Sequence, residues 1–305
     1  MAPPLRKPWA LRPGGTIGIA APAAAVDPAK LAAGEERLRK AGFTVVRRPD
    51  LLARHRYLAG DDARRAGELM ELVADPAVDA IVCARGGWGS PRILHRLDAA
   101  VVRAARKPLV GFSDLTALLL WQRRAAGLVG FHGPMLDRGG DLRDEELDAL
   151  VAALTGDGPT TFRGSAGGGG RAEGRLVGGS LTMIAASLGT PWAIDTRGAI
   201  LLLEDTGERP YRIDRMLWQL RAAGCFARVA GIGLGRFDDC DEANGSVTAA
   251  EVLRELVEEL GVPWVEGLPF GHGAPNLTWP LGVRARLDGA RAELHVLEPG
   301  VAERR

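Results

Sequence analysis

The sequence predicts an α/β protein of two domains, with a parallel sheet in the first domain and a smaller, strand-rich α+β arrangement in the second. Short apolar segments alternate with helical patterns in the first half, which is typical of a parallel sheet covered by helices on both faces. A glycine-rich segment over 156–170 then interrupts the pattern, as a flexible linker does. We therefore predict domains over 1–155 and 171–305, joined by a linker over 156–170.

Apolar runs and helix-start signals place the elements of the first domain. Asp61 stands directly before a helical pattern and is placed to cap it. Right-handed crossovers between parallel strands bring the strand ends, and any site, to one edge of the sheet. The predicted strands are 16–21, 43–46, 80–84 and 109–112, and the predicted helices are 28–40, 61–73 and 115–124.

The second domain has a more mixed pattern of strands and helices. Its GIGLG segment over 231–235 is expected to be a closely packed strand, because Arg236 occupies the last position of a dinucleotide fingerprint. The predicted strands are 175–177, 199–203 and 229–234, with a closing antiparallel pair over 282–287 and 291–297. The predicted helices are 213–221 and 248–260.

Composition and charge exclude several classes of partner. The formal net charge of the 305 residues is +1, so no overall field favours nucleic acid or an anionic membrane. The longest apolar runs, such as 117–121, are far shorter than a membrane span. The first 15 residues, MAPPLRKPWALRPGG, lack the apolar region of a signal peptide, so we expect a cytoplasmic protein.

The sequence contains no pattern that indicates a metal or a cofactor. Cys83, Cys225 and Cys240 form no CxxC pair, and we expect three reduced thiols. No HExxH or His-x-His motif is present. The acidic segment 238–245 misses the spacing of a calcium loop and is interpreted as a solvated turn. We therefore predict an enzyme or binding protein that holds no metal and no cofactor.

Ser113 lies in a segment, LVGFSDLT, that runs from a buried strand through a tight turn into a helix. A serine at such a turn projects from the sheet edge, and the N–H of Asp114 at the helix start can stabilise an oxyanion. The pattern is G-x-S-x-L rather than G-x-S-x-G, so a plain helix cap is an alternative interpretation. The preceding RGGWGS loop over 85–90 can supply a second N–H beside Ser113, or can be a simple turn.

An acid and two histidines complete the candidate residues. Glu204 stands where an apolar strand ends, and a carboxylate there needs a partner such as a histidine. A strand terminus turning into solvent is the alternative. His272 lies on a loop between two glycines, while His132 in an FHGP segment is its rival as a catalytic base. From the residues alone, either histidine can serve.

These segments together resemble the LD-carboxypeptidase family of serine peptidases, also called muramoyltetrapeptide carboxypeptidases. The resemblance runs in order along nearly the whole chain, and its last two blocks are long and specific. The matching segments are RGGWG at 85–89, GFSD at 111–114, HGP at 132–134, GGSL at 178–181, EDTGERPYRIDRML at 204–217 and GHGAPNLTWPLG at 271–282.

The resemblance implies a Rossmann-like first domain, a smaller β-rich second domain and a Ser-His-Glu triad. The triad maps to Ser113, His272 and Glu204, with Ser113 before the linker and the other two after it. The oxyanion hole of the family is made of backbone amides, which map to Asp114 and to Gly86 or Gly87. The family also implies a homodimer.

The implied reaction is cleavage of an L-to-D peptide bond that releases D-alanine from a murein tetrapeptide in cell-wall recycling. Trp88 and Trp279 replace residue types that are commoner in relatives, so both are predicted to shape the substrate pocket. A sister branch inactivates microcin C-type peptide-nucleotides, and the same triad is compatible with that amidase activity. A two-lobed protein that binds a small ligand without chemistry is the alternative of another class.

Overall fold

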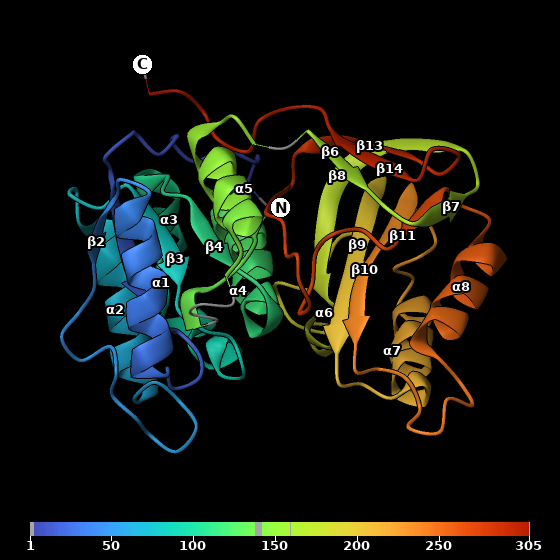
Figure 1. The fold of residues 1–305 in the computed structure, drawn as a ribbon, viewed down its shortest axis with the longest axis horizontal. Coiled ribbons are helices and arrows are strands. Elements are labelled where there is room, and N and C mark those ends of the chain that lie inside the picture. The colour runs from blue at the N-terminus through green and yellow to red at the C-terminus, as the bar shows by residue number, and fades with distance from the viewer. Residues whose placement is uncertain (1–2, 138–141, 159, 305) are drawn as a thin grey trace. The chain divides into compact units, whose positions relative to one another are not determined.

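The computed structural model describes residues 3–137, 142–158 and 160–304, which form two compact units. Each unit contains its own β-sheet with helices packed around it (Figure 1). The first unit comprises residues 1–158, 277–280 and 299–305, and the second comprises residues 159–276 and 281–298. The α/β fold predicted from the alternating pattern is confirmed.

The sheet of the first unit has the strand order β12-β5-β4-β3-β1-β2. The five strands from β5 to β2 are mutually parallel, as the alternation of strands and helices predicted. Their bounds are β1 Thr16–Ala20, β2 Thr44–Val46, β3 Ala80–Cys83, β4 Leu109–Gly111, β5 Gly130–His132 and β12 Trp279–Leu281. The middle of the sheet is buried, since strands β3 to β5 are buried along their whole length.

Helices connect these strands and begin at capping residues. Asp61 accepts a hydrogen bond from Arg64 N at 2.7 Å and caps α2, as predicted. Asp27 caps α1 in the same way, through Ala29 N and Lys30 N. The bounds are α1 Pro28–Lys40, α2 Asp62–Ala74, α3 Ala99–Ala105, α4 Thr116–Trp121 and α5 Asp144–Thr155.

The second unit is built on a mixed sheet with the order β6-β14-β13-β8-β9-β10-β11-β7. Strands β8 to β11 are parallel, and the outer strands on both sides pair antiparallel, including the predicted closing pair β13 and β14. The bounds are β6 Thr161–Arg163, β7 Ala166–Gly168, β8 Arg171–Ser180, β9 Ala199–Thr206, β10 Gly231–Asp238, β11 Trp264–Glu266, β13 Arg284–Asp288 and β14 Glu293–Val296.

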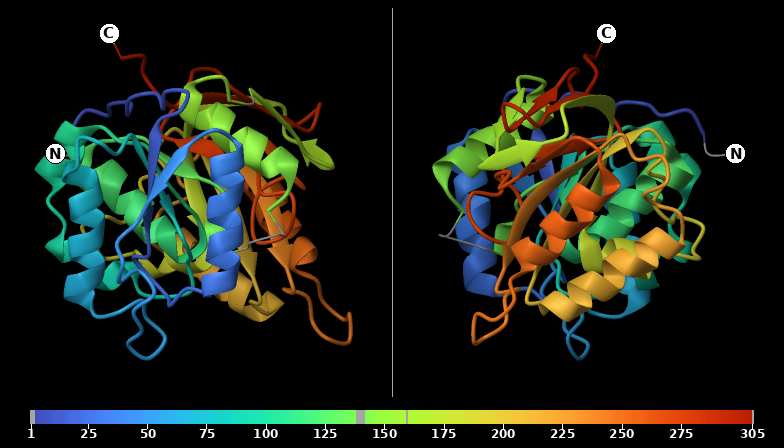
Figure 2. Two further views of the ribbon diagram at one scale, coloured as in Figure 1. Left: turned by 60° about the vertical axis from the view of Figure 1, so that its left-hand side comes forward. Right: turned by 90° about the vertical axis from the view of Figure 1, so that its right-hand side faces the viewer.

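Three helices accompany this sheet: α6 Leu181–Ala186, α7 Pro210–Ala222 and α8 Ala249–Leu260. Helices α7 and α8 lie side by side, and Arg221 of α7 pairs with Glu259 of α8 (Figure 2). Helix α8 begins with a capping box, in which Thr248 and Glu251 bond each other's backbone N–H groups.

The glycine-rich segment 156–170 is not the flexible linker that its composition suggested. Strands β6 and β7 lie inside it and pair with β14 and β11. Its glycines permit neighbouring segments of the chain to approach closely. A Cβ at Gly167 would stand 2.5 Å from Gly289 O, and one at Gly168 would stand 2.9 Å from the Trp264 indole nitrogen. Composition alone does not distinguish this use of glycine from flexibility.

The predicted boundary also needs correction near the C-terminus. Residues 277–280 and 299–305 belong to the first unit, although they lie in the range 171–305 assigned to the second. Strand β12 joins the edge of the first sheet beside β5. Contiguous domains were the simplest expectation, and the sequence contains no signal that the chain returns.

Gly178 on β8 marks a place where two strands touch. Its φ is +146°, and a Cβ there would collide with the backbone of Leu202 on β9. We expect Gly178→Ala to lower the free energy of unfolding by about 3 kcal/mol, since it combines backbone strain with overpacking. Gly198→Ala is the control, because Gly198 has φ +63° but open space around it. Urea unfolding should show the larger loss at Gly178, and equal losses would contradict the collision.

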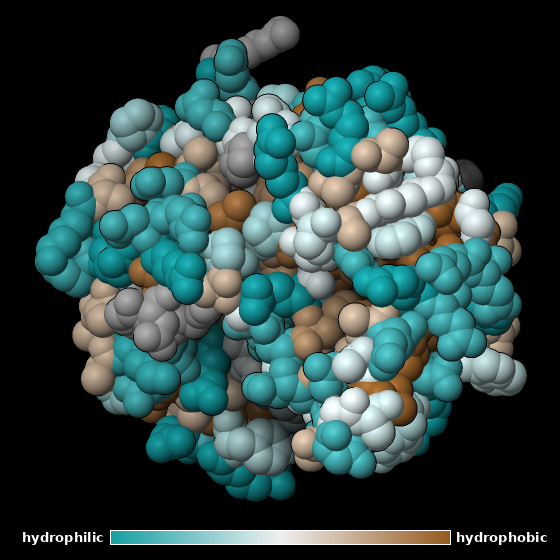
Figure 3. Space-filling model, turned by 45° about the vertical axis from the view of Figure 1, so that its right-hand side comes forward, coloured by the Kyte–Doolittle hydropathy of each residue, from teal (hydrophilic) through white to brown (hydrophobic). Residues whose placement is uncertain are grey.

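The face of the molecule in Figure 3 is mainly hydrophilic, with small apolar areas between polar side chains. Large apolar side chains that remain exposed include Tyr57, Trp88, Tyr211 and Trp218. None of the helices in the described residues is long and apolar enough to cross a membrane. The three cysteines are buried and free, as expected.

Candidate active site

Ser113 occupies a strained turn between β4 and α4. The chain leaves β4 at Gly111, passes Phe112 and enters a 3-10 turn over Ser113–Leu115 that continues into α4. The φ of Ser113 is +61°, a left-handed conformation that is uncommon for a residue with a side chain. Such strain persists only where the surroundings impose it, and it clusters at functional sites. The turn has the strand-turn-helix form predicted for a nucleophile.

The glycine-rich loop after β3 lies directly beside this serine. A Cβ at Gly86 would stand 3.1 Å from Ser113 Cβ and 3.3 Å from its Oγ. Gly87 has φ +85°, and a Cβ there would be 2.7 Å from the Ala24 methyl carbon. Both glycines therefore allow a close approach that a larger residue would disturb. The loop, Ser113 and Asp114 meet at the carboxyl ends of β3 and β4, as the topology predicted.

Asp114 joins this loop to the serine turn through its side chain. Its buried carboxylate accepts hydrogen bonds from Gly89 N at 3.2 Å and Ser90 N at 2.8 Å. Its backbone oxygen accepts a further bond from Ser90 Oγ at 2.8 Å. Burial raises the pKa of Asp114, while the bonds from Ser90 and Gly89 and the nearby charge of Arg65 act against this rise.

Glu204 and His272 form a hydrogen-bonded pair in the second unit. Glu204 lies on β9 with 0% of its surface exposed, and its Oε2 is 2.8 Å from His272 Nδ1. Burial alone would lower the pKa of His272, but the bond to Glu204 and the charges of Glu204, Asp205 and Asp238 outweigh it, so the pKa is raised. Burial raises the pKa of Glu204, and His272 opposes that rise. A histidine bonded at Nδ1 can exchange protons through Nε2.

Two polar contacts fix the loop that carries His272. Gly271 N donates to Asn276 Oδ1 at 3.1 Å, and Gly273 N donates to Asp238 Oδ2 at 2.6 Å. Arg236 in turn holds Asp238 at 3.0 Å. The backbone on both sides of the imidazole is therefore restrained, which keeps the ring against Glu204.

Asp205, besides its charge near His272, holds the segment at the start of α6. Its Oδ2 accepts a hydrogen bond from Thr182 N at 2.7 Å, at the start of α6. Ser180 at the end of β8 is opposite Glu204 in the strand register and caps the same helix through Met183 N. Hydrogen bonds and strand pairing thus join the segments over 178–182 and 204–205, where β8 and β9 end.

The two tryptophans predicted to shape a substrate pocket differ in exposure. Trp88 follows the two glycines of the loop and is 44% exposed, so it is open to contact with a ligand. Trp279 is 1% exposed and stacks on His132, with ring centroids 5.0 Å apart. The prediction of a substrate contact at Trp279 is therefore corrected to a packing role, because β12 carries this residue into the first sheet.

His132, the rival base, is fully buried in the first unit. Its ring lies between Trp279 and Phe112, whose centroid is 5.6 Å away. His295 forms a second histidine–glutamate contact, with Nε2 3.1 Å from Glu293, but it lies on β14 and also contacts Thr161 Oγ1. His272, by contrast with His295, is bonded to a carboxylate that is 0% exposed, that of Glu204 near the end of β9.

Sequence reasoning missed residues that fix the Ser113 turn in the first unit and the His272 loop in the second. Asp238 was interpreted as part of a solvated turn, yet it anchors the His272 loop. Its position at the end of β10, the strand parallel to that of Glu204, was an available signal. Arg65 and the side chain of Asp114 were not singled out because their contacts are distant in sequence, and the local bond of Asn276 to Gly271 N has no signature in the sequence. No group of three or more histidine, cysteine, aspartate or glutamate side chains in the described residues could hold a metal ion.

Comparison with known proteins identifies the class. The profile of the LD-carboxypeptidase N-terminal domain matches residues 17–133, and that of the LD-carboxypeptidase C-terminal domain matches residues 173–287. The chain therefore belongs to the LD-carboxypeptidase family, and it is a serine-type carboxypeptidase.

Individual relatives are similar over almost their whole length. A Bacillus subtilis protein named "Probable murein peptide carboxypeptidase" is 37% identical, with 97% of this chain and 96% of the relative covered. The murein tetrapeptide carboxypeptidase of Pseudomonas aeruginosa is 34% identical, with 91% and 94% covered. The solved structure of the microcin C7 self-immunity protein MccF in complex with glutamyl sulfamoyl guanosine superposes with a TM-score of 0.90 at 26% identity, covering 97% of this chain and 99% of that one.

Proposed function

We propose that this carboxypeptidase cleaves an L-to-D peptide bond and releases the terminal D-alanine of a murein tetrapeptide. Ser113 is the nucleophile, His272 the general base and Glu204 the residue that orients the base. The observation that carries the proposal is the bond between buried Glu204 and His272 Nδ1 at 2.8 Å. It matches the acid–histidine half of a serine-hydrolase triad, and the strained turn at Ser113 matches the nucleophile half.

In the proposed reaction, Ser113 Oγ attacks the carbonyl carbon of the bond that precedes D-alanine. His272 Nε2 takes the hydroxyl proton, and the negative charge of Glu204 stabilises the imidazolium. The N–H groups of Asp114 and of Gly86 or Gly87 donate to the oxyanion. The C–N bond then breaks, and His272 passes its proton to the leaving amine of D-alanine. Water hydrolyses the acyl-enzyme, and the proton that His272 takes from it returns to Ser113.

Murein peptides are proposed as substrates because the names of the relatives from Bacillus subtilis and Pseudomonas aeruginosa mention them. The exposed Trp88 of the glycine-rich loop over 85–90 is proposed to contact the peptide. A place in cell-wall recycling, a cytoplasmic location and a homodimer complete the proposal. Cell fractionation and light scattering test the last two.

The substrate assay compares two peptides that differ in one stereocentre. We expect the protein to release alanine from a murein tetrapeptide ending in D-alanine, and to leave the peptide ending in L-alanine intact. Mass spectrometry of the products gives the cleaved bond directly. Hydrolysis of both peptides at equal rates would contradict the proposed L-to-D specificity.

A second candidate is an amidase acting on peptide-nucleotides. It is favoured by the close superposition on MccF, which was solved with glutamyl sulfamoyl guanosine. The same assay distinguishes the two, with an aminoacyl sulfamoyl nucleoside offered beside the tetrapeptide. Cleavage of the nucleoside conjugate alone would favour this second function.

A further inference from the structure

Helix α2 carries a charged side chain into the interior of the first unit. Arg65 is 0% exposed, although it bears a guanidinium group. A buried charge is strongly unfavourable unless it is paired and hydrogen-bonded. The contacts that compensate this burial therefore indicate what the residue is for.

The guanidinium of Arg65 connects three segments. Its Nη1 donates to Pro22 O at 2.6 Å and to Gly89 O at 2.7 Å, and its Nη2 pairs with Asp62. Pro22 follows β1, and Gly89 belongs to the glycine-rich loop after β3. Arginine is suited to this arrangement because its planar fork donates in several fixed directions at once.

Gly89 is consequently held from both sides. Its N–H donates to Asp114 at 3.2 Å, and its carbonyl accepts from Arg65. Its φ is +138°, and a Cβ there would stand 2.9 Å from Arg65 Nη1. The start of the loop is held as well, since Gly86 O accepts from Ala24 N at 3.0 Å. The backbone between these anchors carries the N–H groups of Gly87 and Trp88.

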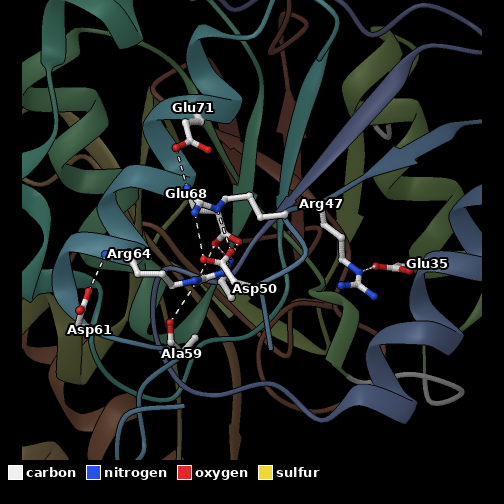
Figure 4. A network of polar contacts seen from close by, with 10 residues as sticks. Glu35, Arg47, Asp50, Ala59, Asp61, Arg64, Glu68 and Glu71 are labelled. Atoms are coloured by element: carbon white, nitrogen blue, oxygen red, sulfur yellow. Dashed lines mark hydrogen bonds and ion pairs between the residues drawn. The ribbon is translucent and has the colours of Figure 1, made fainter. Parts of the chain in front are cut away.

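The position of α2 relative to the loops is itself fixed by Glu68, less than one turn further along the helix. Glu68 accepts a hydrogen bond from Ala21 N at 2.6 Å, directly before Pro22. Arg64 pairs with Glu68 at 2.5 Å and links it to Asp50 in an ion-pair network (Figure 4). These bonds fix the position of α2, from which Arg65 extends toward the glycine-rich loop.

We propose that Arg65 is a positioning residue that sets the oxyanion-stabilising amides of the glycine-rich loop against Ser113. The inference deepens the proposed function and rests on its serine mechanism. Arg65 bonds the carbonyl oxygen of Gly89, and none of the hydrogen-bond partners described above is a reacting atom. It acts by fixing Gly89, so that the amides nearer Ser113 are held where charge develops in the transition state. A misplacement of about 1 Å in such a site lowers the rate on the order of 10²-fold.

The test replaces Arg65 by lysine, which keeps the charge but cannot donate in the fixed fork of a guanidinium. We expect kcat for the tetrapeptide to fall on the order of 10²-fold per active site while KM changes little, because the loss is confined to the transition state. Active sites are counted by titration with a fluorophosphonate. The second-order rate of that phosphonylation should fall by a similar factor, since the phosphonyl oxygen also occupies the oxyanion site.

Arg92→Lys is the matched control. Arg92 pairs with the same Asp62 at 2.9 Å, but from the surface, with 42% of its side chain exposed. Its replacement should leave kcat and the phosphonylation rate unchanged. A drop in kcat for Arg65→Lys without a drop in phosphonylation would overturn the inference, as would unchanged values of both.

Asp114→Asn provides a second variant that does not disturb α2. An amide has one oxygen, so Gly89 N or Ser90 N loses its acceptor, and the same loss of kcat and phosphonylation is expected. If Arg65→Lys does not fold, Asp114→Asn tests the anchoring of Gly89 from its other side, and unchanged kcat and phosphonylation in that variant would overturn the inference. If the wild-type protein is phosphonylated at Ser113 but cleaves no tetrapeptide, the proposed substrate fails while the positioning role is still measured by the phosphonylation rate.

Discussion

Ser113→Ala and His272→Ala are each expected to lower kcat by about 10⁴–10⁶-fold, because nucleophile and base act as a unit and losing either removes the covalent route. The double variant should lose no more than the worse single variant. Tetrapeptide hydrolysis followed by mass spectrometry measures the loss, and fluorophosphonate labelling should disappear in Ser113→Ala. Hydrolysis near the wild-type rate by Ser113→Ala would eliminate this serine as the nucleophile.

Two control variants separate catalysis from folding. His295→Ala removes another histidine that contacts a glutamate, Glu293 at 3.1 Å, and it should leave kcat unchanged. Ser113→Gly should be as inactive as Ser113→Ala but more stable by roughly 1 kcal/mol, because glycine relieves the strain at φ +61°. Equal stability of the two Ser113 variants would show that the turn stores no strain.

The periodic parts of the fold could be predicted from the sequence. The helix over 28–40, the capping by Asp61 and the parallel strands of the first sheet follow from patterns within a few residues, and the structure confirms them. The return of β12 to the first sheet could not be predicted, because it depends on contacts between segments more than a hundred residues apart. The prediction of a flexible linker over 156–170 failed for a related reason, because glycine occurs both in flexible segments and where strands pack closely.

The residues of the candidate site also include some that the sequence could predict and some that it could not. Glu204 and His272 stood out because an acid at the end of an apolar strand and a histidine between glycines are unusual locally, and the structure brings them together. Trp279 was misjudged because its unusual side-chain type says nothing about its burial. Arg65 and Asp238 were missed because a single arginine or aspartate has no local signature, and only the fold reveals what it bonds.

Glu204→Gln is expected to lower kcat by about 10⁴-fold, the size of loss seen when the acid of a catalytic triad becomes an amide. The carboxylate fixes the imidazole with its proton on Nδ1, so that Nε2 can accept the proton of the nucleophile. A glutamine can present its NH₂ group to Nδ1 and thereby stabilise the wrong tautomer. Steady-state hydrolysis of the tetrapeptide at saturating substrate measures the change.

The same variant should change the pH dependence in a definite direction. His272 must be neutral to act as a base, and its pKa in the wild-type protein is raised above 6.5, so kcat/KM should fall as the pH drops through that raised value. Removing the charge of Glu204 leaves burial, which lowers the pKa of His272, with fewer opposing charges. The residual activity of Glu204→Gln should therefore persist to lower pH than that of the wild type.

The folding stability should also depend on pH through His272. It should fall as the pH rises, whereas kcat/KM falls as the pH drops. Because the pKa of His272 is raised in the folded state, its protonation stabilises the fold fully below about pH 6.5, and this contribution is lost as the pH rises through the raised value. Glu204→Gln should weaken that part of the pH dependence in urea unfolding.

Glu293→Gln is the control for the activity profile, since it alters the contact of His295 and should leave the pH dependence of kcat/KM unchanged. If kcat/KM of Glu204→Gln falls at the same low pH as kcat/KM of the wild type, Glu204 does not set the pKa of the base.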